Sequence, residues 1–125
     1  MFNIPNKVKV GANEYSIEYP EQIVYRGETV DGLISHAESK IKILASSKGT
    51  WRDYTFMHEI VHALLENAGL ENTEDICDRL ARQLHAFLLD NPNIFNVEHE
   101  TKQELDVKCV ENQLEQDLYV NRTEV

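Results

Sequence analysis

The chain has few cysteines and lacks any long apolar run, which argues against a disulfide-stabilised protein and against a membrane-spanning one. Its two cysteines, Cys77 and Cys109, lie far apart without C-x-x-C spacing, so we expect reduced thiols, with Cys77 as a small buried side chain. No stretch approaches the roughly 18 consecutive apolar residues of a membrane span, and the first residues lack the basic and apolar regions of a signal peptide. We therefore expect a cytoplasmic protein with no membrane partner.

Positive charge is scarce as well. The chain has 22 acidic residues against 12 lysines and arginines, a formal net charge of −10, which argues against nucleic acid as a partner. Residues 96–125 hold eight acidic and three basic side chains, so about half of the net charge lies there. We expect one small domain at 1–95, with a single core, and an acidic C-terminal extension at 96–125.

The extension carries a weak amphipathic pattern. Four side chains recur there near helical spacing: Leu105, Cys109, Leu114 and Leu118. We interpret this pattern as a helix that docks on the domain or joins chains together, against the alternatives of a partner-binding element and a partly disordered tail. The oligomeric state stays open.

Residues 57–65 contain an H-E-x-x-H motif on a stretch predicted to be helical. Thr50-x-x-Asp53 offers an N-terminal capping signal, and Gly69 stands where the helix would end. Apolar side chains recur at helical spacing and predict a stripe that faces the core: Met57, Val61, Leu64 and Ala68.

The motif has the chemistry of a metal site. On a helix, His58 and His62 lie one turn apart, with Cβ atoms roughly 5–6 Å from each other, which suits two imidazole ligands of one zinc ion. Glu59, between them, can take a proton from a metal-bound water. The alternative is two surface histidines that are four residues apart by chance, because short motifs have false positives.

Strands are predicted before this helix and a second helix after it. Residues 7–19 and 33–44 each alternate apolar and polar side chains around a break, which is typical of a β-hairpin. We expect three or four antiparallel strands, with the motif helix covering their apolar face. Residues 74–89 have a helical period after Asn72 and Thr73, which are capping candidates. The short turn between the two helices makes them neighbours.

The second helix is expected to supply a third ligand, because a catalytic zinc usually has three protein ligands and an open position. Glu74 and Asp78 are four residues apart and share a face, so we assign Glu74 as the ligand and Asp78 as the acceptor of a hydrogen bond from a ligating histidine. Asp75 is expected to face solvent. His85 is the main rival for the ligand role, and Asp78 itself is another.

Two further side chains near the motif are left outside the predicted site. His36 lies in a predicted strand just before the motif helix, and a strand histidine is more often a hydrogen-bonded bystander than a ligand. Tyr54 lies one turn before His58, and we expect it to pack with Trp51 against the sheet instead of stabilising an oxyanion.

The segment H-E-I-V-H at 58–62, followed by E-D-I-C-D-R-L-A at 74–81 and L-L-D-N-P at 88–92, resembles the small zincin-like metallopeptidases of phages and mobile elements. These are related to the ImmA/IrrE group, whose second segment reads E-x-x-A-[ND]-x-F-A and is followed by L-L-x-P. The resemblance covers about residues 30–92. Cys77 departs from it, because the group usually has alanine at that position.

The resemblance implies a minimal zincin fold of α+β class, with a small antiparallel sheet packed on the H-E-x-x-H helix. It also implies zinc held by His58, His62 and Glu74, with Glu59 as general base, in a zinc metallopeptidase that acts on a protein or peptide, such as a regulatory protein. The Glu74-x-x-x-Asp78 spacing is similar to that in gluzincins between a metal ligand and the carboxylate that supports a ligating histidine. Mn²⁺ and Ni²⁺ stay open as alternatives to zinc.

The rival function is a regulatory or protein-binding module that holds zinc and cleaves nothing. Glu59 favours the enzyme, because a structural zinc site needs no base and is more often closed by four protein ligands.

Overall fold

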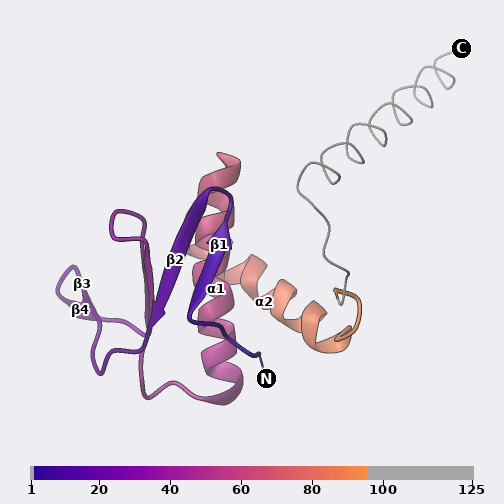
Figure 1. The fold of residues 1–125 in the computed structure, drawn as a ribbon, viewed down its shortest axis with the longest axis horizontal. Helices are drawn as coiled ribbons and strands as arrows, with labels where there is room; N and C mark the ends of the chain where they lie inside the picture. The colour runs from indigo at the N-terminus through magenta and orange to yellow at the C-terminus, as the bar shows by residue number, and fades with distance from the viewer. Residues whose placement is uncertain (1, 96–125) are drawn as a thin grey trace, which may run out of the picture. The chain divides into compact units, whose positions relative to one another are not determined.

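The computed structural model of the chain describes residues 2–95 (Figure 1). In chain order the elements are β1 (Lys7–Val10), β2 (Asn13–Glu18), β3 (Val24–Tyr25), β4 (Glu28–Thr29), β5 (Gly32–Ser35), β6 (Lys40–Ile43), α1 (Gly49–Ala68) and α2 (Glu74–Asp90). They all lie in one compact unit, Met1–Asn91. The acidic extension at 96–125, with its expected helix, lies outside the described residues.

Four of the strands form one sheet in the order β1-β2-β6-β5, and β3 and β4 form a separate two-stranded hairpin. Both predicted hairpins are confirmed, because β1 pairs with β2 and β5 pairs with β6 in antiparallel register. The expectation of an all-antiparallel sheet is wrong: β2 and β6 run parallel, with Ile17 opposite Ile41. The sheet is therefore mixed, within an α+β fold.

Burial explains why β6, and not β5, lies beside β2. Ile41 and Ile43 of β6 are fully buried, whereas all four residues of β5 are only partly buried. The more apolar strand of the second hairpin occupies an inner position, and the other is left at the edge. Because the chain must cross over to reach that inner position, β6 arrives parallel to β2.

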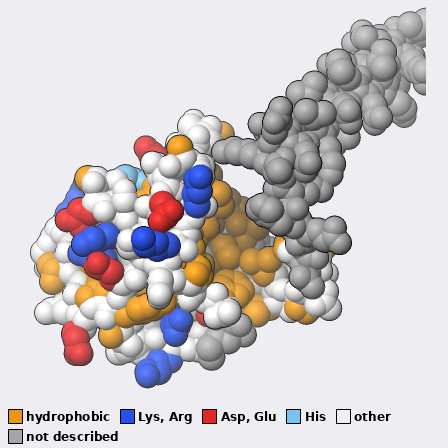
Figure 2. Space-filling view, viewed as in Figure 1, with side chains coloured by type: hydrophobic (Ala, Val, Ile, Leu, Met, Phe, Trp, Pro, Cys, Tyr) orange, Lys and Arg blue, Asp and Glu red, His pale blue; other side chains and the backbone are white. Residues whose placement is uncertain are grey.

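The sheet has one apolar and one charged face. Side chains that alternate along the strands form a core with Ala63 of α1: Val10, Tyr15, Ile17, Ile41 and Ile43. The opposite face, seen in Figure 2, carries interspersed charges such as the pairs Lys7–Glu14 (3.6 Å) and Lys40–Glu18 (3.3 Å). The motif helix thus covers the apolar face of the sheet, as predicted.

Helix α1 is buried along two stripes, because the sheet packs on one side of it and α2 on the other. Every second residue is buried as a result: Asp53, Thr55, Met57, Glu59, Val61, Ala63 and Leu65. The predicted single stripe is correct for Met57 and Val61 but wrong for Leu64 and Ala68, which are exposed. Tyr54, His58 and His62, which are each four residues apart, form a third stripe between the two buried stripes.

The ends of the helices follow local signals only in part. Gly69 ends α1 in the left-handed conformation (φ 67°), as expected, and the Thr73 hydroxyl caps α2 by accepting from Ile76 N at 3.2 Å. The capping role of Thr50 and Asp53 is wrong, because α1 begins earlier, after Lys48, without a side-chain cap. Asp53 is instead buried and accepts from Phe2 N at 2.7 Å.

Helix α2 packs against α1 through residues spaced one turn apart, Cys77, Ala81 and His85, all of which are buried. Cys77 is fully buried, as predicted. Neither α1 nor α2 is both long and apolar enough to cross a membrane.

Candidate metal centre

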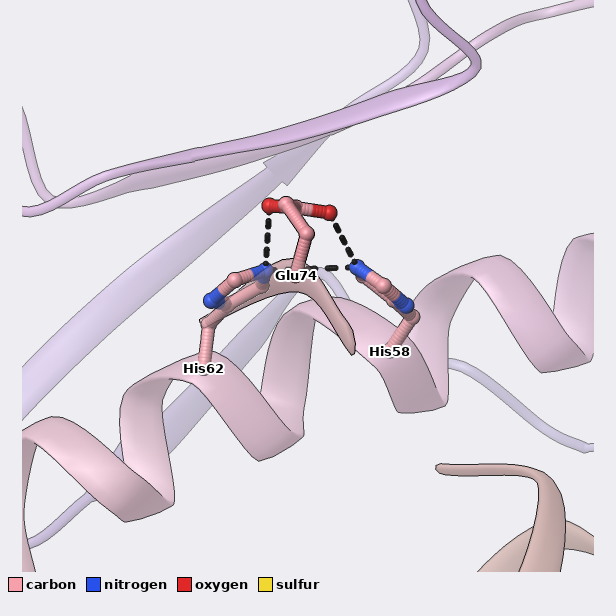
Figure 3. Close-up of side chains that lie close together, drawn as sticks. All are labelled: His58, His62 and Glu74. Atoms are coloured by element: carbon pink, nitrogen blue, oxygen red, sulfur yellow. Dashed lines mark hydrogen bonds and ion pairs between the residues drawn. The ribbon is translucent and has the colours of Figure 1, made fainter. Parts of the chain in front are cut away.

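Three predicted ligands come together at the start of α2 (Figure 3). Glu74 reaches over α1 so that its Oε2 lies 3.1 Å from His58 Nε2 and its Oε1 lies 2.9 Å from His62 Nε2. The two Nε2 atoms are 3.2 Å apart. The three side chains form a group of donor atoms that all lie within 4.8 Å of one another.

These distances fit a single divalent cation. Four ligands at about 2.0–2.1 Å from a tetrahedral zinc lie roughly 3.3 Å from one another, close to the separations in the triad. The two imidazoles and one carboxylate are a donor set that zinc accepts, and they leave a coordination position open. His58 and His62 are largely buried, whereas the side chain of Glu74 is 81% exposed, so the histidines are the better fixed part of the group.

Asn72, in the turn between the helices, fixes the tautomer of His62. Its amide nitrogen donates to the His62 carbonyl at 3.1 Å, which directs Oδ1 toward His62 Nδ1 at 2.8 Å. His62 therefore donates from Nδ1 and keeps its lone pair on Nε2. That lone pair faces an oxygen of Glu74, so two acceptors meet and require a proton or a cation between them.

Asp78 does not have the predicted role. Its Oδ1 accepts a hydrogen bond from the Tyr54 hydroxyl, and its Oδ2 pairs with Arg82 at 3.1 Å, so neither oxygen is placed to orient a histidine of the triad. The hydrogen bond from Tyr54 lowers the pKa of Asp78. The expected contact with His62 is made instead by Asn72 of the turn, whose Oδ1 lies 2.8 Å from His62 Nδ1.

The other candidates on α2 lie away from the triad. Asp75 is exposed and pairs with Arg79 at 3.3 Å, as expected of a solvent-facing residue. His85, the rival ligand, is buried between the rings of Phe2 (5.3 Å) and Tyr54 (6.4 Å). Cys77 Sγ touches His62 Nδ1 at 3.2 Å, but on the side of the ring away from the metal position. Burial raises the pKa of Cys77 to about 11, so it stays a thiol.

Replacing Asn72 by alanine is expected to weaken zinc affinity about 10-fold to 100-fold, because His62 loses the acceptor that holds its ring and tautomer. Asn72→Asp keeps an acceptor at the same place and should restore most of the affinity. A competition titration against a chelating dye measures both, with exposed Glu71→Ala in the same turn as the control. Equal affinity of Asn72→Ala and wild type would contradict the assigned role.

Glu59 is buried beside the triad at the wall formed by β5. The residue is 6% exposed, and burial first, with the charge of Glu74 second, raises the pKa of its carboxyl group to about 8. A cation bound by the triad would favour the ionised form. Glu59 is thus a desolvated carboxyl group one residue from a candidate ligand, which is an environment typical of a general base.

Gly32 of β5 makes room for Glu59. A Cβ atom at this position would lie 2.6 Å from Thr55 Cγ2 and 3.1 Å from Glu59 Oε1. Strand β5 therefore passes directly over the carboxyl group, and only glycine allows this approach.

We expect Gly32→Ala to destabilise the fold by about 1–3 kcal/mol, because the new methyl group overlaps Thr55. Urea unfolding of the variant measures the loss. Thr55→Ser removes Cγ2 but keeps the hydroxyl that donates to Trp51 O at 2.9 Å, so the double variant should regain part of the stability. Full stability of Gly32→Ala alone would show that β5 does not approach α1 this closely.

The triad and Glu59 lie in a cleft of about 580 Å³ between β5 and the two helices. Tyr54 lies on its wall, with its ring 6.2 Å from that of His58, and burial followed by the hydrogen bond to Asp78 raises the pKa of its hydroxyl. His36 also lines the cleft, and its Nδ1 lies 2.9 Å from the Tyr15 hydroxyl. Tyr54 packs on Trp51 at a ring-centroid distance of 5.4 Å, as expected, but Trp51 is 52% exposed, and Tyr54 packs on the cluster between α1 and α2 that contains Met57 and Cys77.

Three contributors to the site were missed from the sequence: Asn72, Gly32 and Trp51. Asn72 carried a local signal, but one for helix capping, whereas the role of Gly32 depends on its approach to the distant Thr55 and Glu59. No family model, curated protein or solved structure matches this chain.

Proposed function

We propose that the protein is a metal-dependent peptidase in which His58, His62 and Glu74 hold one zinc ion and Glu59 is the general base. One observation carries the proposal: a buried carboxyl group, Glu59, lies in the same cleft as three convergent metal-ligating side chains. A purely structural site has no use for a desolvated base or for an open cleft beside it.

The zinc ion would supply a Lewis acid that lowers the pKa of water and polarises a carbonyl group. Glu59 removes a proton from the attacking water and later delivers it to the leaving amine, while burial excludes bulk water from the proton transfer. Asn72 keeps His62 in the tautomer that presents Nε2 to the cleft. The proposal includes membership of the ImmA/IrrE-related zincins, which the motifs resemble. It also includes a cytoplasmic location and a regulatory protein as the substrate.

The substrate would bind to the open edge of β5. Leu44 N donates to Asp31 O at 2.9 Å, and in antiparallel register the next pairs bonded in this way are Leu33–Lys42 and Ser35–Lys40. The peptide groups of Gly32 and Ile34 therefore point away from β6, toward the cleft. An extended peptide can pair with these groups as an added strand, which gives main-chain recognition beside Glu59.

A peptide library incubated with the zinc-loaded protein tests the function, with cleavage read by mass spectrometry. We expect cleavage that stops when a chelator removes the metal and returns when zinc is restored. A protein that binds one zinc per chain yet cleaves no peptide would refute the peptidase proposal and favour a non-catalytic zinc-containing binding module.

A further inference from the structure

A second pocket lies at the start of α1. It has a volume of about 290 Å³ and is lined by the residue after β2, the segment after β6 and the first turn of α1: Tyr19, Ala45, Ser47, Lys48, Gly49 and Arg52. None of these residues lines the cleft that holds His58 and Glu59. The pocket is therefore separate from the candidate metal centre, and its chemistry can be considered by itself.

Two cations and no carboxylate are among the side chains that line this pocket. Lys48 is exposed and forms no ion pair with any described residue. Arg52 lies over the Tyr19 ring at 5.1 Å and donates from Nη2 to the Tyr19 hydroxyl at 3.4 Å, but it has no carboxylate partner within residues 2–95. Asp53, the next residue, is buried and accepts from Phe2 N instead. In a chain with a net charge of −10, two unpaired cations that share a pocket indicate an anionic ligand.

The backbone at the start of α1 adds unpaired donors to the same pocket. Helix α1 begins after Lys48 without a side-chain cap and has no acidic residue in its first turn. The N–H groups of Gly49, Thr50 and Trp51 donate to no group in the described part of the chain. They form the positive end of a 20-residue helix, where the charges of Lys48 and Arg52 are unfavourable unless an anion is present. An anion bound here would satisfy both the N–H groups and the two cations.

Two side chains of the pocket also lack a hydrogen-bond partner, which is an independent indication of a ligand. Ser47 is only 9% exposed, and its hydroxyl makes no hydrogen bond with any residue that the structure describes. Arg52 Nε is buried and is likewise without a partner among these residues. Buried polar groups are nearly always hydrogen-bonded, because an unpaired one has lost its interaction with water. An acceptor in the pocket would supply the missing partner to both side chains.

The loop before α1 is held in place by backbone hydrogen bonds. Ala45 N donates to Pro20 O at 2.8 Å, which ties the segment after β6 to the end of β2, and Ser47 N donates to Leu44 O at 2.9 Å. Gly49 has a positive φ of 60°, and a Cβ atom there would meet no atom within 4 Å. The donors of the pocket are thus brought together by the fold, and the approach to the first turn of α1 is open.

We propose that this pocket binds the phosphate group of a small molecule through Lys48, Arg52, the Ser47 hydroxyl and the first N–H groups of α1. These donors match an anion that accepts at several oxygens and carries close to two negative charges at pH 7, as a phosphate monoester does. A carboxylate has two oxygens and one charge, so it would leave one cation and several donors unpaired. The site requires neither zinc nor a peptide, so it would stand even if the peptidase proposal failed.

Calorimetric titration of the full chain with inorganic phosphate and with methyl phosphate, at fixed ionic strength, tests the site. We expect one phosphate group to bind per chain, with acetate and chloride at least about 10-fold weaker. Binding of inorganic phosphate alone would identify free phosphate as the ligand, whereas methyl phosphate that binds at least as tightly would identify the phosphate end of a larger molecule. Acetate that binds as tightly as phosphate, or no binding of either phosphate, would overturn the proposal.

Lys48→Asp separates phosphate binding from folding. Lys48 has the extended backbone of an N-cap residue (φ −138°, ψ 159°), so an aspartate there can accept from the first turn of α1. We expect the variant to bind phosphate at least about 100-fold more weakly, since a cation is replaced by an anion. Without phosphate it should melt about 4–8 °C above the wild type, because the new side chain caps the helix. Unchanged phosphate binding in this variant would overturn the proposal.

Arg52→Gln is expected to weaken phosphate binding about 10-fold to 100-fold, because a charge-assisted donor is lost. Arg26→Gln is the matched control, since Arg26 also lies over a tyrosine ring, that of Tyr25, at 5.1 Å but does not line the pocket. An equal loss in both variants would contradict the assigned site. All titrations are run with and without zinc, and phosphate binding that requires zinc would place the anion at the metal centre and refute the proposal.

Discussion

Glu59→Gln is expected to lower the rate of peptide hydrolysis by about 10²-fold to 10⁴-fold while zinc stays bound. Glutamine has nearly the shape of glutamate, so it fits under Gly32, but it cannot take a proton from water. The raised pKa of Glu59 favours the neutral form of its carboxyl group, and the glutamine amide is neutral as well. The fold should therefore tolerate the substitution. Initial rates on a peptide cleaved by the wild type, with zinc content measured in parallel, check the prediction.

Glu71→Gln provides the matched control for that experiment. It makes the same chemical change at an exposed position in the turn between α1 and α2, so its rate and zinc content should equal those of the wild type. Hydrolysis that survives in Glu59→Gln at the wild-type rate would mean that another group, or none, removes the proton. Loss of zinc in this variant would instead show that Glu59 supports the metal and not the chemistry.

What could be predicted from the sequence was encoded locally. The spacing of His58 and His62 requires only that the segment be helical, and the apolar period and Gly69 both indicated a helix. Glu74 followed from a short turn, because such a turn leaves little freedom in how the start of α2 faces α1. The two hairpins have the same origin, since each is specified by alternation and a turn within about a dozen residues.

What could not be predicted depended on contacts between distant segments. The parallel pairing of β2 with β6 results from the burial of Ile41 and Ile43, and alternation alone does not tell an inner strand from an edge strand. The prediction of Asp78, instead of Asn72, as the hydrogen-bond acceptor for a ligating histidine was wrong for a similar reason. Sequence spacing places Asp78 on the correct face of α2, but Tyr54 of α1 takes its hydrogen bond, and the turn supplies the acceptor for His62.

His58→Ala and His62→Ala are each expected to abolish zinc binding, from one ion per chain to none. Each imidazole is one of the three proposed ligands and is largely buried, so water cannot replace it at the same position. Glu74→Ala should weaken binding less, because its side chain is 81% exposed and water can take its place. Elemental analysis of the purified variants measures the zinc content. His36→Gln is the control, because His36 lines the cleft but lies outside the triad.

The same variants test whether zinc binds to the triad in the folded protein and thereby stabilises it. Zinc that binds only the folded chain raises its free energy of unfolding by about 4 kcal/mol at a thousandfold excess over Kd. A shift of this order in urea unfolding should occur for the wild type and for His36→Gln and should vanish in His58→Ala. If zinc shifted no unfolding curve, or shifted that of His58→Ala equally, the cation would be bound elsewhere. In that case Glu59 would lose its role as a base, because the carboxyl group activates water only where a metal lies beside it.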